Sequence, residues 1–192
     1  MRLAGNMERA AELAGELVNL ATAGAARGQD YLPPRGEALA EQFSRVVTAH
    51  WAGEVRRTRD AAIRVEQMAQ EFRTVFQANG DAETADALNR LLRRYGTRPY
   101  LAVSPDQLAH LHFHGDAETP VESLGGEFAA GLALVVDAYG HGRLGICTAH
   151  HCDRVYVDLT RNGSRRYCSN ACGARAKMAA YRSRLSADEP GR

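Results

Sequence analysis

Residues 147–177 read CTAHHCDRVYVDLTRNGSRRYCSNACGARAK and contain all four cysteines of the 192-residue chain. The cysteines form two pairs, Cys147-x4-Cys152 and Cys168-x3-Cys172, with fifteen residues between the pairs. Two closely spaced cysteine pairs are typical of a structural zinc site in which each of two turns supplies two thiolates. We therefore predict one structural zinc ion per chain, held by these four cysteines.

The segment around the cysteines also has a readable local pattern. Residues 147–152 predict a tight turn, residues 154–158 alternate like a strand, and Asn162-Gly163 indicates a hairpin turn that returns through Arg165 to Cys168. Ser169 is suited to cap a helix that reaches about Leu185. Turn, hairpin and helix together predict a small, treble-clef-like zinc module at residues 145–185, followed by a polar tail at residues 186–192.

Two other readings of the cysteines are possible. A disulfide framework is the weaker one, because the chain is much longer than the small scaffolds that need cross-links, and no secretory leader is expected. A redox switch that releases zinc on oxidation stays open as an alternative, and it would require accessible thiolates.

Charge is distributed unevenly along the chain. Residues 1–146 carry 15 arginines and 19 acidic residues, whereas residues 147–184 carry seven arginines, one lysine and only two acidic residues. Such a basic segment is the pattern expected of a nucleic-acid contact, even after zinc and four thiolates subtract two charges. The predicted DNA-contacting residues are Arg154, Arg161, Arg165, Arg166, Arg175, Lys177, Arg182 and Arg184.

The preceding 144 residues are predicted to form a mainly helical domain with one β-hairpin. Apolar residues recur at helical spacing in segments 3–21, 37–51, 54–77, 81–95 and 121–139, the last apolar on most of its surface. Residues 99–103 and 108–114 alternate like the strands of a hairpin. The fold class is therefore mainly α with small β, with domains at residues 1–144 and 145–185.

Several other signals carry less weight. Gly140-His141-Gly142-Arg143-Leu144-Gly145 fits a dinucleotide-binding pattern but leads into the cysteine turn, not into a helix. His110, His112 and His114 share one strand face, which is more typical of a wetted surface than of a metal site. No catalytic motif is found, and a zinc with four cysteine ligands has no open position, so we expect no enzyme activity.

The cysteine segment resembles a known family. The residues that carry the resemblance are Cys147-x4-Cys152, Tyr156-x-Asp158, Arg165-Arg166-Tyr167-Cys168-Ser169 and Cys172-Gly173-Ala174-Arg175-Ala176-Lys177. They resemble the CGNR zinc finger of bacterial stress-induced transcription regulators, and Leu17-Val18-Asn19 with the helix and hairpin order resembles the helical ABATE domain that accompanies it. The signature asparagine is Ala174 here, which puts any contact made by that amide in doubt.

The resemblance implies a bacterial transcription regulator, whereas charge and spacing alone imply zinc and a polyanion. We expect a protein that binds duplex DNA through its zinc module, with a helical domain that holds a small effector, forms a homodimer, or both. A protein-binding or RNA-binding zinc module stays open as an alternative. No apolar run approaches the length of a membrane span, so we expect a cytoplasmic protein without membrane contact.

Overall fold

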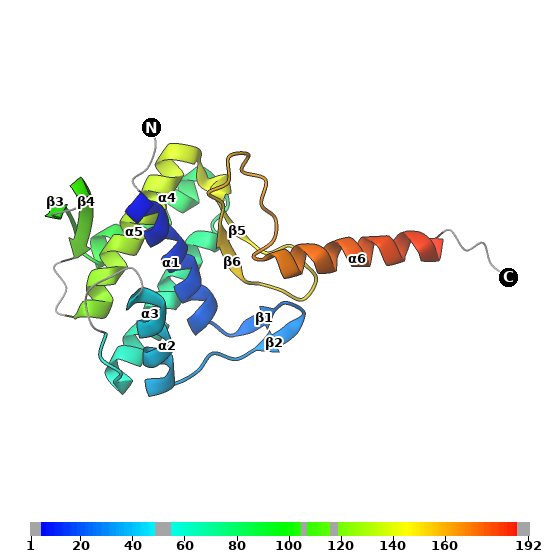
Figure 1. Ribbon diagram of the computed structural model, residues 1–192, viewed down its shortest axis with the longest axis horizontal. Coiled ribbons are helices and arrows are strands. Elements are labelled where there is room, and N and C mark those ends of the chain that lie inside the picture. Colours follow the sequence, from blue (N-terminus) through cyan, green and yellow to red (C-terminus); the bar gives the residue numbers. More distant parts are fainter. Residues whose placement is uncertain (1–4, 49–54, 105–106, 116–118, 188–192) are drawn as a thin grey trace.

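A computed structural model describes residues 5–48, 55–104, 107–115 and 119–187 of the chain. Figure 1 shows a helical body from which one long helix projects at the C-terminal end. The helices of the body are α1 (Gly5–Ala21), α2 (Glu37–Thr48), α3 (Arg59–Gln77), α4 (Gly80–Arg94) and α5 (Pro120–Tyr139). All five predicted helices of the body are confirmed, and the fold is mainly helical with small β-hairpins, as predicted.

The helix boundaries differ from the prediction where capping decides them. Helix α3 begins at Arg59, not near residue 54, because the Thr58 side chain accepts the backbone N–H of Ala61 at 3.2 Å and ends the extended segment there. Helix α4 begins at Gly80, one residue before the predicted segment, with Asn79 at its N-cap position. The predicted last turn of α2 lies in residues 49–54, outside the described residues.

Helix α5 lies at the centre of the core, as its nearly continuous apolar sequence predicts. Its buried residues include Phe128 and Leu132, and the Phe128 ring packs edge-on against Phe72 of α3 at 6.3 Å between centroids. Helices α1 and α5 cross closely at Gly131. A Cβ atom at this glycine would lie 2.8 Å from the backbone nitrogen of Ala11, so a larger residue would force the helices apart.

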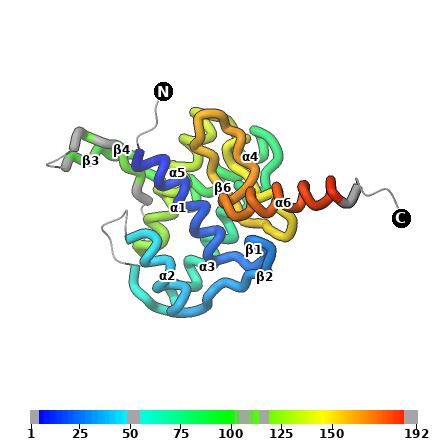
Figure 2. Tube along the Cα trace, turned by 45° about the vertical axis from the view of Figure 1, so that its right-hand side comes forward, coloured from blue at the N-terminus to red at the C-terminus, as the bar shows by residue number. Residues whose placement is uncertain are grey.

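The predicted hairpin in the body is confirmed as β3 (Thr97–Ser104) and β4 (Gln107–Gly115), which pair antiparallel and lie against α5. Figure 2 shows the hairpin extending from the body on the side away from α6. His112 is half-buried, with its ring stacked on Tyr100 at 5.5 Å and its Nδ1 atom 3.4 Å from Oε1 of Glu127. The side chains of His110 and His114 lie outside the described residues, so a shared histidine site stays untested.

The strand pairing of the cysteine segment differs from the prediction. Strand β6 (Val155–Val157) pairs with β5 (Leu144–Ile146), which follows a short 3-10 helix, η1 (His141–Arg143). The predicted pairing with residues 165–167 is therefore wrong, because Val155 and Val157 are buried in the core of the body and their strand edge is taken by β5. Helix α6 (Asn170–Ala187) follows and projects into solvent (Figure 1).

A further hairpin escaped prediction. Strands β1 (Gly24–Ala26) and β2 (Gln29–Tyr31) are joined by a two-residue turn in which Arg27 and Gly28 both have positive φ angles of 54° and 89°. This conformation suits glycine and is rare for arginine, so the sequence lacks the usual Asn-Gly or Asp-Gly signal of such a turn. In the sequence, Gly24 and Gly28 instead indicate a break between two helices.

One hydrophobic cluster runs through both predicted domains. Val155 and Val157 of β6 are buried together with the helices of the body, and both lie 3.9 Å from the position that a Cβ atom on Gly15 of α1 would occupy. The cysteines form a second, smaller cluster next to it. Among the described residues, no helix is both long and apolar enough to span a membrane.

Candidate metal centre

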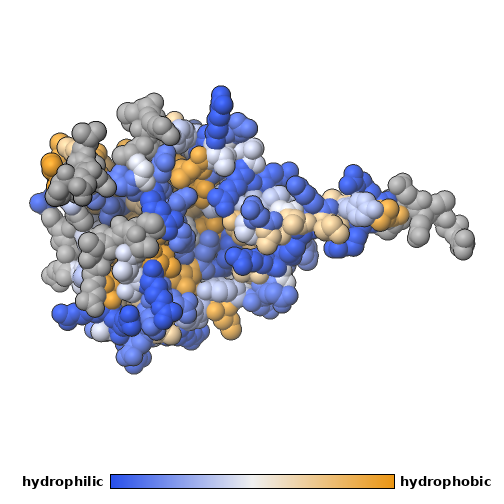
Figure 3. Space-filling model, in the orientation of Figure 1, coloured by the Kyte–Doolittle hydropathy of each residue, from blue (hydrophilic) through white to orange (hydrophobic). Residues whose placement is uncertain are grey.

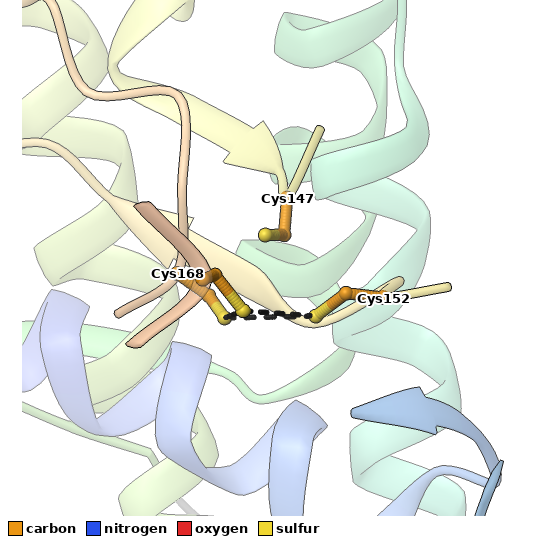
Figure 4. Close-up of side chains that lie close together, drawn as sticks. Cys147, Cys152 and Cys168 are labelled. Atoms are coloured by element: carbon orange, nitrogen blue, oxygen red, sulfur yellow. Dashed lines mark hydrogen bonds between the residues drawn. The ribbon is translucent and has the colours of Figure 1, made fainter. Parts of the chain in front are cut away.

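The four cysteine side chains converge on one point. Cys147 follows β5, Cys152 precedes β6, Cys168 precedes α6, and Cys172 lies in the first turn of α6. Their Sγ atoms all lie within 4.8 Å of one another, and those of Cys152, Cys168 and Cys172 form a triangle with sides of 3.7 Å. Figure 4 shows the labelled cysteines pointing inward from separate segments.

These distances fit a tetrahedral metal site. Zinc–sulfur bonds of about 2.3 Å in tetrahedral geometry place the sulfur atoms about 3.8 Å apart. The three sides of 3.7 Å match this edge, whereas a disulfide needs a separation of about 2.05 Å. The cysteines are free thiols positioned to bind one metal ion, which fits the predicted structural zinc.

Local hydrogen bonds hold the two ligand pairs in place. The backbone N–H of Cys147 donates to the carbonyl of Arg154 at 2.8 Å and closes the first cysteine turn. The backbone N–H of Cys172 donates to Oγ of Ser169 at 3.3 Å, which confirms Ser169 as the cap of α6. The backbone N–H of Thr148 donates to the carbonyl of Arg166 at 3.0 Å and connects the two pairs.

The thiols differ in their electrostatic environment. Burial alone would raise the pKa of Cys152, but backbone hydrogen bonds from Arg27 and Arg154 outweigh it and lower the pKa to about 7. Burial raises the pKa of Cys147 and of Cys168, the latter also through the charge of Cys147. Bound zinc would favour the thiolate form of all four, and a fourth cysteine leaves no open position for water.

The geometry defines a structural zinc-binding module with four cysteine ligands. The comparison with known families agrees: residues 143–185 match the family model of the CGNR zinc finger. No curated protein matches the chain. Ala174, which stands where this family's resemblance leads us to expect asparagine, is exposed on α6, so its side chain supports neither the metal site nor the core.

The unpredicted β1–β2 hairpin supports the first cysteine turn from the side of the body. The backbone N–H of Gly28 donates to the carbonyl of His151 at 2.9 Å, and Nε2 of His151 lies 2.9 Å from Oδ1 of Asp30. Ala25 and Asp153 exchange two hydrogen bonds, each of 3.0 Å. With the contribution of Arg27 to the Cys152 thiolate, the hairpin contacts the metal centre directly.

Asn19 connects helix α1 to strand β6. Its amide accepts the backbone N–H of Val155 at 2.8 Å and donates to the carbonyl of the same residue at 2.9 Å. The side chain thereby pairs with β6 as a neighbouring strand would. It gives the backbone N–H and carbonyl of Val155 hydrogen-bond partners that they would otherwise lack. The family resemblance includes Asn19 but assigns it no role.

Arg154 requires a correction. Its side chain is only 4% exposed, and its guanidinium donates to the carbonyls of Asn19 at 2.8 Å, Thr22 at 2.9 Å and Ala23 at 3.4 Å. It also pairs with the carboxylate of Asp153. Because these partners are all internal, Arg154 holds the zinc module against α1 and is removed from the predicted DNA-contacting set.

Two other predicted residues have internal partners but stay partly or fully accessible. Arg165 donates to three backbone carbonyls, of Val157, Tyr167 and Cys168, and so braces the loop before the second cysteine pair. Arg175 donates from Nη2 to the carbonyl of His150 at 3.0 Å. Its buried Nη1 has no hydrogen-bond partner among the described residues.

The remaining five predicted residues are exposed, three of them on α6 and two in the loop before it. An open groove of about 880 Å³ on one side of α6 is lined by Arg166, Lys177 and polar groups of Ser169 and Asn170. A second hollow of about 450 Å³ on the other side is lined by Arg175, Arg182 and His150. Figure 3 shows hydrophilic side chains along both sides of the projecting helix. The exposed set is Arg161, Arg166, Lys177, Arg182 and Arg184.

Proposed function

We propose that the protein is a bacterial transcription regulator that binds duplex DNA through its zinc finger and carries out no reaction. The observation that supports this most is the character of α6 and the loop before it. Three exposed basic side chains lie on this projecting helix and two in the loop before it, and the sequence of α6 contains no acidic residue. A cationic helix that stands clear of its own protein is suited to a phosphate backbone.

In this proposal the two sides of α6 have different roles. Arg166 and Lys177 line the larger groove and would contact phosphates together with the polar groups of Ser169 and Asn170. Arg175 and Arg182 line the hollow on the other side and would approach a base edge from there. The resemblance to stress-induced regulators with an ABATE domain supplies the transcriptional role. A homodimer is proposed because one small finger makes limited contacts with DNA, and a cytoplasmic location is part of the same proposal.

The proposal is tested with the purified, zinc-loaded protein and a random duplex library. Selection should enrich one sequence, and binding to it should weaken steeply as salt rises. In a plot of the logarithm of the binding constant against that of the salt concentration, each phosphate contact removed should reduce the slope by about 0.9. A variant with Arg166, Lys177, Arg182 and Arg184 replaced by glutamine should lower the slope by up to about 3 to 4.

The control variant replaces three exposed arginines on α4 of the body, Arg90, Arg93 and Arg94, by glutamine, and it should leave DNA binding unchanged. An equal loss in both variants would mean that overall charge, not α6, drives binding. Preference for single-stranded RNA over duplex DNA, or no binding to either, would contradict the proposal.

A further inference from the structure

A second groove, of about 580 Å³, lies in the helical body and is separate from the zinc finger surface. It runs between the C-terminal end of α1, the segment before α2 and one side of α3. The residues of α3 that line the groove recur at the three- or four-residue spacing expected for one side of a helix; they are Arg59, Ala62, Ile63, Glu66, Gln70 and Arg73. The groove is therefore a built feature of three packed segments.

One end of the groove is electropositive. Arg35 and Arg59 both line it there, and in the described part of the chain neither side chain makes a hydrogen bond or an ion pair. Gly36, directly before helix α2, and Arg59, the first residue of helix α3, both line the groove, so the positive ends of two helix dipoles border it. Two unpaired guanidinium groups beside two helix N-termini favour an anion.

The other end of the groove is already neutralised. Arg73 donates to Oδ2 of Asp153 at 2.9 Å and to the hydroxyl of Thr22 at 3.2 Å, so its charge is satisfied within the protein. Arg73 lies about 21 Å from Arg59 along the axis of α3. The free positive charge is therefore confined to the Arg35 and Arg59 end.

The middle of the groove is apolar. Its lining there includes Ala62, Pro33 and Ile63, and Ile63 is 54% exposed although it is a large aliphatic residue. An uncovered isoleucine beside free cations matches a ligand with a negatively charged head and an apolar body. Among the described residues that line the groove, Glu66 is the only acidic one, and it lies beyond Ile63, two turns from Arg59.

We propose that this groove binds a small amphiphilic carboxylate, whose carboxylate pairs with Arg35 and Arg59 and whose hydrocarbon chain covers Ile63. Arg73 places the far end of the same groove next to Asp153, which directly follows the metal ligand Cys152. The site is thus positioned to act as the effector site of the proposed regulator. That regulatory role rests on the proposed function, whereas carboxylate binding does not.

The probe for the test is octanoate, titrated calorimetrically into the zinc-loaded protein without DNA. We expect saturable binding with one octanoate per chain, and binding at least about tenfold weaker in an Arg35→Gln, Arg59→Gln double variant, because two charge-assisted hydrogen bonds are lost. Ile63→Ser should also weaken binding. Arg90→Gln, which removes an exposed arginine of α4, should leave it unchanged.

Two ligand controls separate the parts of the proposal. Octanamide has the same chain without charge and should bind at least about tenfold more weakly than octanoate. Inorganic phosphate has the charge without the chain and should compete at least about tenfold more weakly than octanoate itself. A photoreactive octanoate analogue should label residues 59–73. Equal binding of octanamide, phosphate competition as strong as that of octanoate, labelling elsewhere, or an unchanged affinity in the double variant would each overturn the proposal. Because no DNA is present, these outcomes are independent of whether the protein binds DNA.

Discussion

Arg154 offers the sharpest test of how the zinc finger is attached to the body. We consider Arg154→Met, which keeps a long apolar side chain but removes the guanidinium. Three carbonyl groups at the end of α1, those of Asn19, Thr22 and Ala23, lose their donor, and Asp153 loses its closest cation. The stacking of the guanidinium over the Tyr31 ring, at 5.0 Å, is lost as well.

The size of the effect follows from burial. Leaving a buried acceptor without its donor typically costs about 1–3 kcal/mol, and three carbonyls lose their donor here. Asp153 adds less, because its side chain is 35% exposed and keeps Arg73 as a partner. Arg154 is 4% exposed, so little solvent compensation is expected, and we predict a loss of about 3–5 kcal/mol in the free energy of unfolding. That loss is a large share of the roughly 5–15 kcal/mol that stabilises an ordinary domain.

The assay is urea unfolding of the zinc-loaded protein, followed by circular dichroism and by zinc release. Arg161→Met is the matched control, because Arg161 is an exposed arginine of the same module, and a change within about 0.5 kcal/mol is expected there. If Arg154→Met lowered the unfolding free energy by less than about 1 kcal/mol, the internal hydrogen bonds of Arg154 would not hold the module to the body. Normal stability with impaired DNA binding would instead restore Arg154 as a DNA contact.

Three further predictions concern the same module. Metal analysis should give one zinc per chain, and Cys172→Ser should abolish it, whereas retention of stoichiometric zinc would refute the four-cysteine site. Burial alone would raise the pKa of Asp158, but hydrogen bonds from Thr160 and Arg165 lower it below its usual value. Wild type should therefore exceed Asp158→Asn in the free energy of unfolding by its full amount above about pH 4, and this difference should shrink as pH falls further. A pH-independent difference in urea unfolding would contradict this. Arg175→Gln should relax the preference at one base pair by about 1–3 kcal/mol in competition binding, and an unchanged preference would mean that Arg175 makes no base contact.

The metal site was predictable because its signal is local. Four cysteines within 26 residues leave few ways to arrange their sulfur atoms, and the spacing alone predicts the ligand set that the structure brings together. The five body helices were predictable for a related reason: each has an apolar stripe at helical spacing and a break before the next. Both signals lie within a short stretch of the sequence.

The attachment of the finger was not predictable because it depends on contacts between distant residues. Arg154 has the same sequence context as the exposed arginines around it, and only the carbonyls at the end of α1 distinguish it. Strand β5 was not predicted because a glycine such as Gly145 is typical of a linker. In the structure the Tyr156 ring lies so close to Gly145 that no side chain would fit there. The β1–β2 hairpin was hidden by a turn that places arginine at a positive φ angle.

The pairing of Asn19 with Val155 has a consequence for the kinetics of folding. These residues are 136 positions apart, so α1 can complete its packing only after most of the chain has been synthesised. Contacts of such large sequence separation slow folding, because a long loop must close before the contact contributes. Until β6 arrives, the side of α1 around Gly15 stays open to water and to other chains. The nascent protein should therefore depend on chaperones in the interval between synthesis of the helices and synthesis of the zinc finger.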